Sequence, residues 1–553
     1  MTKYRQSSRL SPKPYFLIVG LLLLSWFGFV WFVYLEARGD DVKIHDLKAV
    51  LVWGAVAIVG MTVLLFSVHW WWSALGNEKE RVAAARVEYL RAMAEQDSNR
   101  TQTYALEMRG VGLAIEDWHQ SSLWREIKKK NNNFISIYSQ DPNDLDTSYS
   151  GRQITRSINA RVAFQHAAGE SVAYWPIPVF SLGPTKQPSD TGAAANIVRG
   201  RNAATLGVTL FLWQDAKNGM PAQSMIERLF QFFDENPKVP QALIVGEDGD
   251  VTRNSLRVAG TPGLQNDKVV PTVYENMTGL LVARSDRVNR YIRPFAPQDA
   301  EDNQNKKTDL GKLWAFYWKY SPQFRKVYED ARRAEGIENP YGPGTMSTAY
   351  WQSKLPEFWK TISNRGPGHF EPSPWLPIRW AQHQVDEFDA SPVLGYLHRP
   401  IKVPMQDENG KRLKPALQAK ALQAGWLEAL DTLPKGHKPV RVFYDTTDNL
   451  EAEIALTNAL HELNTDGHGL DIGNVEEGYD IGRRLGNTGV SSALVQINLA
   501  CIASYLDGGT SAVVYAGADG SLTVQMVRPP DEARKEKNRK NRGVDPFRYG
   551  SPS

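Results

Sequence analysis

Three polar residues in the C-terminal part of the chain could supply the chemistry of a serine hydrolase. Asp445, His461 and Ser491 are an orienting carboxylate, a general base and a hydroxyl nucleophile. Such an enzyme exposes its serine on a G-x-S-x-G turn, but residues 489–493 read GVSSA and lack the last glycine. Ser491 is better explained as the start of a helix, where its hydroxyl would accept from free N–H groups. We therefore expect no catalytic residue, and a membrane-anchored serine hydrolase or acyltransferase stays as the alternative.

Motifs for metals and nucleotides are incomplete. His461-Glu462 starts an H-E-x-x-H zinc motif, but Thr465 stands in the place of the second histidine. The acidic run at 247–250, EDGD, lacks the alternating carboxylates of a calcium loop and is predicted to be a solvated turn after a strand. The GVG at 110–112 lacks the third glycine of a dinucleotide-binding turn and is predicted to lie inside a strand. We expect neither a metal nor a cofactor.

The chain has one cysteine, Cys501, within the apolar sequence QINLACIASYL. A catalytic thiolate needs a helix N-terminus or a basic neighbour, and neither is present here. We therefore predict a buried structural thiol. A single thiol also excludes an intrachain disulfide framework and a cysteine-rich zinc or iron–sulfur site.

Side chains suited to binding are more frequent than side chains suited to catalysis. Residues 314–380 hold six of the 17 tryptophans, with arginines interspersed. Tryptophan, tyrosine and arginine anchor many protein interfaces because they bury a large area at low entropic cost. Trp351, Trp359 and Trp375 lie in stretches broken by proline, glycine and serine, and we predict them to be partner-binding anchors. The alternative is that the whole segment is a tryptophan-rich core.

Two further tryptophans in this segment have a different pattern. Trp314 and Trp318 are four residues apart in a predicted helix and therefore share one face of it. A shared apolar face of this kind usually packs against the interior of a protein. We predict that both are core residues.

The end of the chain is basic. Residues 534–542, RKEKNRKNR, contain six basic side chains and one acid. Such a cluster could contact anionic lipid, at about 1 kcal/mol per basic residue near a membrane surface. The alternative is a tail that only aids solubility. By composition, we expect residues 529–553 to be disordered.

Two apolar runs near the N-terminus are long enough to span a membrane. Tyr15–Leu35 has 21 residues without a charge, and Ala49–Val68 has 20. At about 1.5 Å per residue, each reaches the roughly 30 Å of a bilayer core. The first run is too long for the apolar part of a signal peptide, and a second run follows it. We predict a transmembrane helical hairpin that holds the protein at the bacterial inner membrane through residues 15–68.

Basic residues around the two runs predict the orientation of the hairpin. The N-terminal flank has four, the 36–48 loop has three, and the flank after the second run has four. Because cytoplasmic flanks carry the excess of lysine and arginine, both termini and all the soluble domains should face the cytoplasm.

Composition is that of a mainly globular protein. The 553 residues are 42% hydrophobic and 23% charged, with a formal net charge of +3. This balance gives no reason to expect a nucleic-acid partner. The expected domains are a transmembrane hairpin at 1–72, a helical stalk at 73–100, a first α/β domain at 101–295, a Trp/Pro-rich segment at 296–420, a second α/β domain at 421–528 and the basic tail at 529–553.

Alternating strands and helices predict the α/β class on both sides of the Trp/Pro-rich insertion. Thr205–Trp213 is a buried strand by composition, and Met220–Glu235 is an amphipathic helix. The run Gly489–Leu506 is apolar on nearly all sides, so we expect a buried helix. Two mixed α/β regions around an insertion are compatible with a thiolase-like duplicated layout. In that case the usual cysteine nucleophile would be missing.

Several stretches resemble the type VI lipase adapter protein family. They are Tyr104–Arg125, Val172–Leu182, Thr205–Trp213 and the block at 478–527 with YDIGRRLGNTGVSSALVQINLACIASYLD. The resemblance extends over most of residues 100–530, and two N-terminal apolar spans also suit it.

This resemblance implies a bacterial, non-enzymatic adapter. Its partners would be a lipase- or phospholipase-type effector in the producing cell and the spike protein of the type VI secretion apparatus. The family supplies no catalytic residues, which agrees with the incomplete motifs. A structural membrane component of a secretion machine is a further alternative.

Overall fold

The computed structural model of the chain describes residues 13–36, 49–69, 71, 105–130, 135–145, 148–184, 192–214, 222–255, 269–298, 303–336, 342–447, 450–517 and 519–548. The chain divides into two compact units, Met1–Met93 and Ala94–Ser553, and we refer to the second as the body. The predicted stalk at 73–100 lies outside the described residues.

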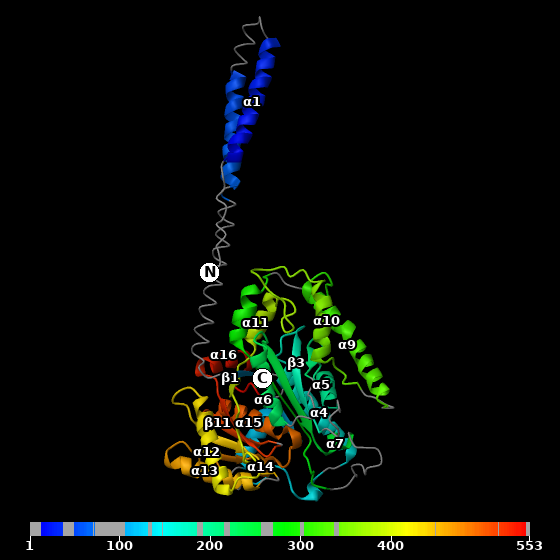
Figure 1. The fold of residues 1–553 in the computed structure, drawn as a ribbon, viewed down its shortest axis with the longest axis vertical. Coiled ribbons are helices and arrows are strands. Elements are labelled where there is room, and N and C mark those ends of the chain that lie inside the picture. The colour runs from blue at the N-terminus through cyan, green and yellow to red at the C-terminus, as the bar shows by residue number, and fades with distance from the viewer. Residues whose placement is uncertain are drawn as a thin grey trace. The chain divides into compact units, whose positions relative to one another are not determined.

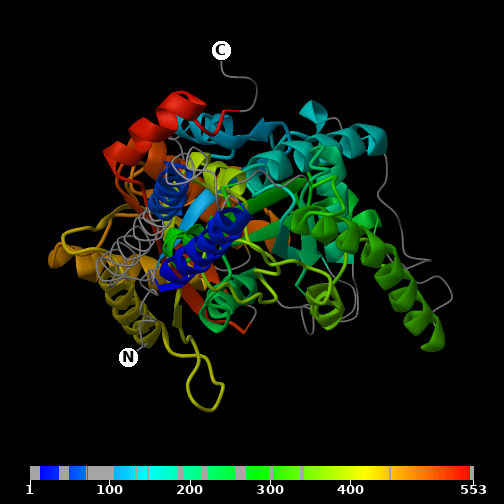
Figure 2. The same cartoon turned by 90° about the horizontal axis from the view of Figure 1, so that it is seen from above.

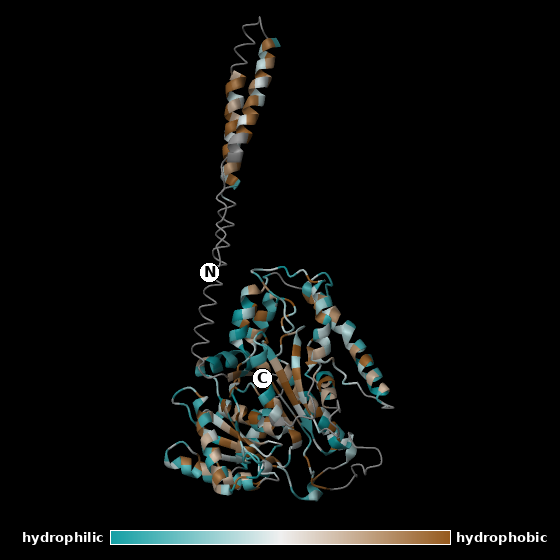
Figure 3. Cartoon of the chain, in the orientation of Figure 1, coloured by the Kyte–Doolittle hydropathy of each residue, from teal (hydrophilic) through white to brown (hydrophobic). Residues whose placement is uncertain are grey.

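The first unit contains two apolar helices, coloured brown along most of their length in Figure 3. Helix α1 spans Lys13–Glu36, and a second helix spans Ala49–His69. The indole N–H of Trp26 donates to the carbonyl oxygen of Leu51 at 3.4 Å. A Cβ atom on Gly54 would lie 2.2 Å from the Trp26 ring, so only glycine permits this contact. Both helices are long and apolar enough to cross a membrane, as predicted.

The body is built on one mixed sheet, visible in Figure 1, with twelve strands among its described residues. The strands are β1 (Ala105–Ile115), β2 (Trp118–His119), β3 (Pro176–Leu182), β4 (Leu210–Trp213), β5 (Gln241–Asp248), β6 (Asn276–Ala283), β7 (Gly395–His398), β8 (Ile401–Val403), β9 (Pro439–Tyr444), β10 (Gly478–Asp480), β11 (Thr510–Ala516) and β12 (Leu522–Arg528). Their order across the sheet is β10-β9-β11-β12-β7-β1-β6-β5-β3-β4. Outside this order, β2 pairs with β1 and β8 pairs with β12.

The two halves of this sheet repeat one topology. In the first half the order β1-β6-β5-β3-β4 has two antiparallel pairs followed by two parallel pairs. The second half, β7-β12-β11-β9-β10, has the same order and the same directions. The halves meet where β1 pairs antiparallel with β7, with Ala105 opposite His398. The expected duplicated layout is therefore confirmed.

Helices connect the strands and cover the sheet (Figure 1). Those of the first half are α3 (Gln120–Lys129), α4 (Tyr149–Ala168), α5 (Gly192–Ala203), α6 (Ala222–Glu235), α7 (Asp250–Ser255) and α8 (Ser285–Arg287). Those of the second half are α12 (Pro415–Asp431), α13 (Leu450–Thr465), α14 (Ile481–Leu485) and α15 (Ser492–Asp507). Short turns of other helical types span Pro142–Asp144, Val288–Ile292, Arg293–Phe295 and Gly489–Ser491.

Helix α15 lies in the interior of the body. Every side chain from Ala493 to Tyr505 is buried, as the all-round apolar pattern predicted. The side-chain amide of Asn498 donates to Thr278 Oγ1 at 2.6 Å and to the carbonyl oxygen of Gly112 at 3.0 Å. Its length and hydropathy also suit a membrane span, but it serves here as the core helix that joins the two halves.

The insertion between the halves covers one edge of the sheet. It contains α9 (Asp309–Ala334), α10 (Thr348–Trp359) and α11 (Gln382–Ala390). At edge strand β4, the backbone N–H of Trp213 donates to the carbonyl oxygen of Met346 at 2.9 Å. This pairing occupies an edge that would otherwise be open to other strands. The end of α9 extends beyond the rest of the body in Figure 1 and Figure 2.

The prediction of a disordered tail is wrong for residues 529–548. Helix α16 spans Glu532–Arg542, and Asp531 caps it by accepting from the N–H of Arg534 at 2.8 Å. Asn538 is buried and donates to the carbonyl oxygen of Val393 at 2.8 Å. Phe547 is fully buried against Tyr505. Composition alone did not predict that this segment is ordered, because two separated residues, the polar Asn538 and the aromatic Phe547, anchor it.

Candidate functional site

The three residues of the hydrolase hypothesis have different surroundings in the structure. Asp445 accepts from the hydroxyl of Ser492 and from the backbone N–H of Thr447, the latter at 2.8 Å. Ser491 is fully buried, and within the described part of the chain its hydroxyl has no hydrogen-bond partner and caps nothing. His461 lies on the exposed side of α13. Among the described residues, no hydrogen bond joins the carboxylate, the imidazole and the Ser491 hydroxyl.

Cys501 lies in the middle of α15 and is fully buried, as predicted. Burial raises the pKa of its thiol well above the usual value, because the apolar surroundings disfavour the thiolate. A thiol of this kind is a poor nucleophile at neutral pH.

The acidic run at 247–250 is buried except for the partly exposed Asp250, so the prediction of a solvated turn is wrong. Glu247 and Asp248 are 1% and 0% exposed at the end of β5. Glu247 pairs with Arg156 of α4 at 3.0 Å and with Arg199 of α5. Asp248 makes a two-pronged ion pair with Arg253 of α7, at 2.8 and 2.9 Å. Three helices thus bring arginines to the end of one strand, where they neutralise its carboxylates.

Two more carboxylates lie beside this cluster. Glu116 follows β1, and Glu275 precedes β6. Desolvation raises the pKa of the partly buried Glu116 to about 7 and that of the buried Glu275 to about 7, because it disfavours the charged carboxylate. Glu275 accepts from the N–H of Val251 and from Thr252 Oγ1, the latter at 3.3 Å. Both groups therefore exchange protons near neutral pH.

The buried carboxylates also connect the two halves of the sheet. Asp248 Oδ2 accepts from the backbone N–H of Val490, which precedes α15, at 2.9 Å. Next to it, the N–H of Tyr274 donates to the carbonyl oxygen of Asn487 at 3.0 Å. Nowhere in the described ranges are three or more His, Cys, Asp or Glu side chains grouped so that they could hold a metal ion. The arrangement fixes the junction between the two halves of the sheet and includes carboxyl groups with raised pKa values.

Sequence reasoning missed this cluster, although part of its signal is visible. Arg152 and Arg156 are four residues apart and share one face of a predicted helix. Arg152 pairs with Asp250 at 3.5 Å. A doubly basic helix face and an acidic strand end of opposite sign are complementary, but no local pattern showed that they meet.

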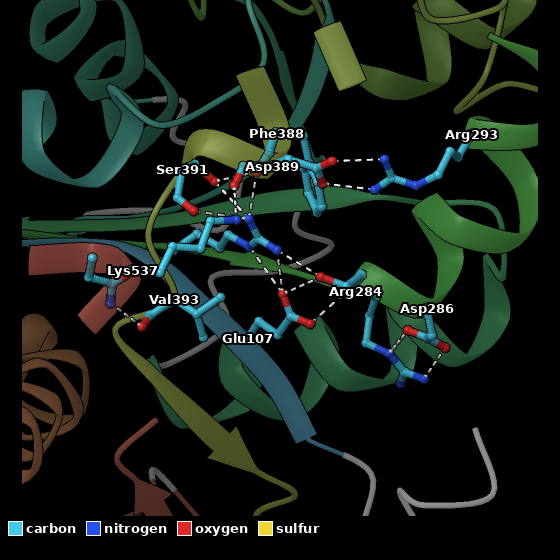
Figure 4. A network of polar contacts seen from close by, with 12 residues as sticks. Glu107, Arg284, Asp286, Arg293, Phe388, Asp389, Ser391, Val393 and Lys537 are labelled. Carbon is cyan, nitrogen blue, oxygen red and sulfur yellow. Dashed lines mark hydrogen bonds and ion pairs between the residues drawn. The ribbon is translucent and has the colours of Figure 1, made fainter. Parts of the chain in front are cut away.

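A second polar network lies at the seam between the halves (Figure 4). Arg109 of β1 is 2% exposed, and its guanidinium donates to Glu107 at 2.7 Å and to Ser285 Oγ at 2.7 Å. The same group donates to the carbonyl oxygen of Phe388 at 2.7 Å and to Ser391 Oγ at 2.8 Å. One side chain thus ties the first half to the segment that leads into the second. All of its hydrogen-bond partners are oxygens, which suits a permanently charged guanidinium.

The tryptophan predictions are largely reversed by the structure. Trp351 is fully buried and packs on Phe316, with ring centroids 5.2 Å apart. Trp375 is 5% exposed, and its indole N–H donates to Asn236 Oδ1 at 2.8 Å. Both are core residues in this conformation, because the proline- and glycine-broken stretches fold inward. Trp359 is half-buried at the end of α10, and its role as a partner-binding anchor stays a prediction.

Trp314 and Trp318, which we expected in the core, are only partly buried. Their rings pack on each other with centroids 5.6 Å apart, and Trp314 also packs on Tyr174. The guanidinium of Arg201 lies 4.7 Å from the Trp318 ring centre. Helical spacing placed them correctly on one face, but this face lies at the rim of the cluster.

Fold and site together define a class of protein. The body is a duplicated α/β protein of thiolase-like layout whose candidate nucleophiles are buried or dispersed. An apolar helical hairpin of membrane-spanning length accompanies it.

Family models match both halves of the body. Residues 104–267 match the N-terminal region of the type VI lipase adapter protein Tla3, and residues 394–529 match its C-terminal region. The chain belongs to the type VI lipase adapter protein family. The resemblance noted from the sequence is therefore confirmed.

Solved structures with a similar fold are distant. The ishigamide ketosynthase/chain length factor is 10% identical, with 77% of this chain and 100% of that chain covered, at a TM-score of 0.37. 3-Oxoacyl-(acyl carrier protein) synthase III from Pseudomonas aeruginosa PAO1 is 11% identical, with 77% and 99% covered, at 0.31. The ketosynthase from module 1 of the bacillaene synthase from Bacillus amyloliquefaciens FZB42 is 10% identical, with 77% and 76% covered, at 0.38. Likeness at this level carries nothing about activity.

Proposed function

We propose that the protein is a non-enzymatic adapter that binds a lipase-type effector in the producing cell and helps to load it onto the type VI secretion spike. The observation that supports it is the family match at 104–267 and 394–529, which together contain most of the strands of both halves of the sheet. An adapter acts by binding, so it needs a rigid scaffold and an accessible surface more than a reactive group.

A non-enzymatic role fits the chemistry of the body. Asp445 is bonded to Ser492, Ser491 is buried, and the only thiol, Cys501, lies inside α15 with a raised pKa. These side chains are positioned for packing, and a substrate in solvent would not reach Ser491 or Cys501 without rearrangement of the core.

We also propose that the hairpin anchors the protein in the bacterial inner membrane, with both termini and the body in the cytoplasm. The four–three–four distribution of basic residues around the two apolar helices supports this orientation. A reporter that is active only outside the cytoplasm tests it. When fused after residue 553 it should be silent, and when inserted into the 36–48 loop it should be active. The reverse pattern would overturn the orientation.

Co-purification tests the adapter role. The full chain would be tagged, extracted in mild detergent from the producing bacterium and analysed for bound proteins by mass spectrometry. We expect a type VI lipase effector, together with the spike protein. In a strain that lacks the adapter, secretion of that effector should fall while the rest of the apparatus still fires. Recovery of no lipase, combined with unchanged effector secretion in the deletion strain, would overturn the proposal.

A further inference from the structure

One face of α4 remains exposed along the whole helix. Ile154, Ser157, Arg161, Gln165 and Gly169, just past its end, follow each other at three- or four-residue intervals. From Ile154 to Gly169 this stripe extends over about 22 Å at 1.5 Å per residue. That length matches six or seven residues of an extended chain, at about 3.3 Å each.

The opposite face of α4 is held tightly against the sheet. In β1, a Cβ atom on Gly112 would lie 1.8 Å from the carbonyl oxygen of Ala163, and one on Gly110 would lie 2.1 Å from that of Ala167. The two glycines therefore let the helix backbone contact the strand directly. They lie inside β1, as predicted, and they make α4 a rigid support.

Two hollows lie along the exposed stripe, one towards each end of α4. The first, of about 440 Å³, is lined by Gln153, Ile154, Ser157, Ile158, Arg161 and Ala203. The second, of about 960 Å³, includes Gln165, His166, Gly169 and Glu170 in its lining. The end of α5 borders the first hollow with Ala203, and the turn that follows borders the second with Ala204, Thr205 and Leu206. We call the stripe and these two hollows the α4 groove.

The C-terminal segment forms a fixed wall of the larger hollow. Phe547 packs edge-on against Tyr505 of α15, with ring centroids 5.4 Å apart. Asp545 accepts from Ser121 Oγ at 2.6 Å and from Arg125 at 2.9 Å. A groove whose floor and wall are both anchored is already formed before a ligand arrives, which lowers the entropic cost of binding.

The two ends of the groove differ in chemistry. At the first end Ile154 is 62% exposed beside the half-buried Ile158. The lining of both hollows together includes four arginines and two carboxylates. Both carboxylates, Glu170 and Asp545, already accept from arginines, whereas the side chain of Arg548 is exposed. The groove therefore offers an exposed apolar side chain, Ile154, with Arg161 near it at one end, and the exposed Arg548 towards the other.

We propose that the α4 groove is the docking site for one segment of the lipase effector, with an apolar side chain against Ile154 and acidic side chains towards Arg548. Charge complementarity and the length of the groove argue for a protein segment of this kind. The inference rests on the proposed adapter function and adds the surface and the chemistry of the partner.

Site-specific cross-linking in the producing cell tests the proposal with the full-length protein. A photo-reactive amino acid at position 154 should form an adduct with the lipase effector, identified by mass spectrometry. The same amino acid at Leu417, which is 50% exposed on α12 in the other half of the body (Figure 1), is the matched control and should form none. An effector adduct at 417 and none at 154 would overturn the groove assignment.

Affinity measurements with the purified effector provide the second arm. Ile154→Glu and Arg548→Glu should each raise the Kd about ten-fold or more, and Leu417→Glu should leave it unchanged. Both replaced side chains are exposed, so the melting temperature should stay within a degree or two of the wild type. If the wild type binds no lipase effector, the adapter function itself fails. If the wild type binds and both groove variants bind equally well, only the docking site is wrong.

Discussion

Glu116 and Glu275 are joined by two hydrogen bonds. The N–H of Glu275 donates to the Glu116 carboxylate at 2.6 Å, and the N–H of Glu116 donates to the carbonyl oxygen of Glu275 at 2.8 Å. This pairing fixes a partly buried and a buried carboxyl group at the point where β1 ends and β6 begins, next to the arginine-paired end of β5. Its consequence is a dependence of stability on pH.

Stability should fall as pH rises through the titration of these two groups. Burial raises each pKa from 4.5 to about 7, so the folded state binds more protons than the unfolded state between these values. The free energy of unfolding therefore decreases from about pH 4.5 to about pH 7. Glu275→Gln mimics the protonated form and should remove the contribution of Glu275 to this pH dependence. The free energy of unfolding of the variant should therefore rise relative to the wild type by about 1–3 kcal/mol between pH 5 and pH 8. Thermal unfolding in detergent across this range measures the difference.

The control for this prediction is an acid with no buried partner. Glu462→Gln on the exposed side of α13 is the matched surface substitution, and it should change the free energy of unfolding by no more than about 0.5 kcal/mol. A Glu275→Gln variant whose difference from the wild type is constant with pH would contradict the assignment.

Removal of the Arg109 guanidinium should strongly destabilise the body. Arg109→Met leaves the Glu107 carboxylate and the carbonyl oxygen of Phe388 without their shared donor inside the seam. We expect a loss of about 3–5 kcal/mol in the free energy of unfolding, as for other broken buried ion pairs. Arg325→Met is the comparison, because Arg325 pairs with Glu329 on the solvent side of α9 and is 65% exposed. That change should cost less than about 1 kcal/mol. Equal losses in the two variants would refute the role of Arg109.

Two neighbouring serines should respond differently to alanine. Ser491→Ala removes a buried hydroxyl that has no hydrogen-bond partner among the described residues, so stability should change by less than about 1 kcal/mol. Ser492→Ala removes a donor to the partly buried Asp445 and should cost about 1–3 kcal/mol. Effector secretion should persist in both variants. Lost secretion in Ser491→Ala at an unchanged melting temperature would support a hydrolase.

Trp351 and Trp359 separate core from interface within a single helix. Trp351→Ala should lower the free energy of unfolding by about 3–5 kcal/mol, because the ring is fully buried against Phe316. Trp359→Ala removes a half-buried ring and should cost less stability. If Trp359 is a partner anchor, its loss should weaken effector binding by about 2 kcal/mol, roughly thirty-fold. Unchanged affinity for Trp359→Ala would exclude it as an anchor.

The sequence predicts those elements whose local pattern agrees with their surroundings. The apolar runs at α15 and at the two N-terminal helices, and the position of Cys501, follow from composition because these segments are uniform over many residues. The duplicated layout was expected only as an analogy. It becomes visible through the pairing of strands that lie far apart in the chain, and no local pattern encodes that pairing.

Strand β3 shows why some local rules fail. Proline cannot donate to a neighbouring strand, so by this rule Pro176 and Pro178 favour an edge position. The structure places β3 between β4 and β5. Its first part, from Pro176 to Val179, pairs with β4, and only the part from Val179 onwards pairs with β5. The prolines therefore occupy a stretch that has a single neighbour, although the strand as a whole has two.

The candidate site was less predictable than the fold. The carboxylates at 247–250 are local, but their partners Arg156 and Arg199 lie about 50 to 90 residues earlier in the chain. Burial of Trp351 and exposure of Ile154 depend on which helix covers which face. A hydrophobic period gives the face of a helix but not the identity of its neighbour.

The position of β1 in the middle of the sheet has a consequence for synthesis. β1 is the first strand of the body to leave the ribosome, yet its partners β6 and β7 begin at Asn276 and Gly395. At roughly 5–20 residues per second, β7 follows β1 by roughly 15–60 s. In the first part of that interval, before β6 is made, the glycine-containing central strand lacks both long neighbours, and afterwards it still lacks the one on the β7 side. The nascent body should therefore need a chaperone, or a transient cover from α3 and α4, until the second half arrives.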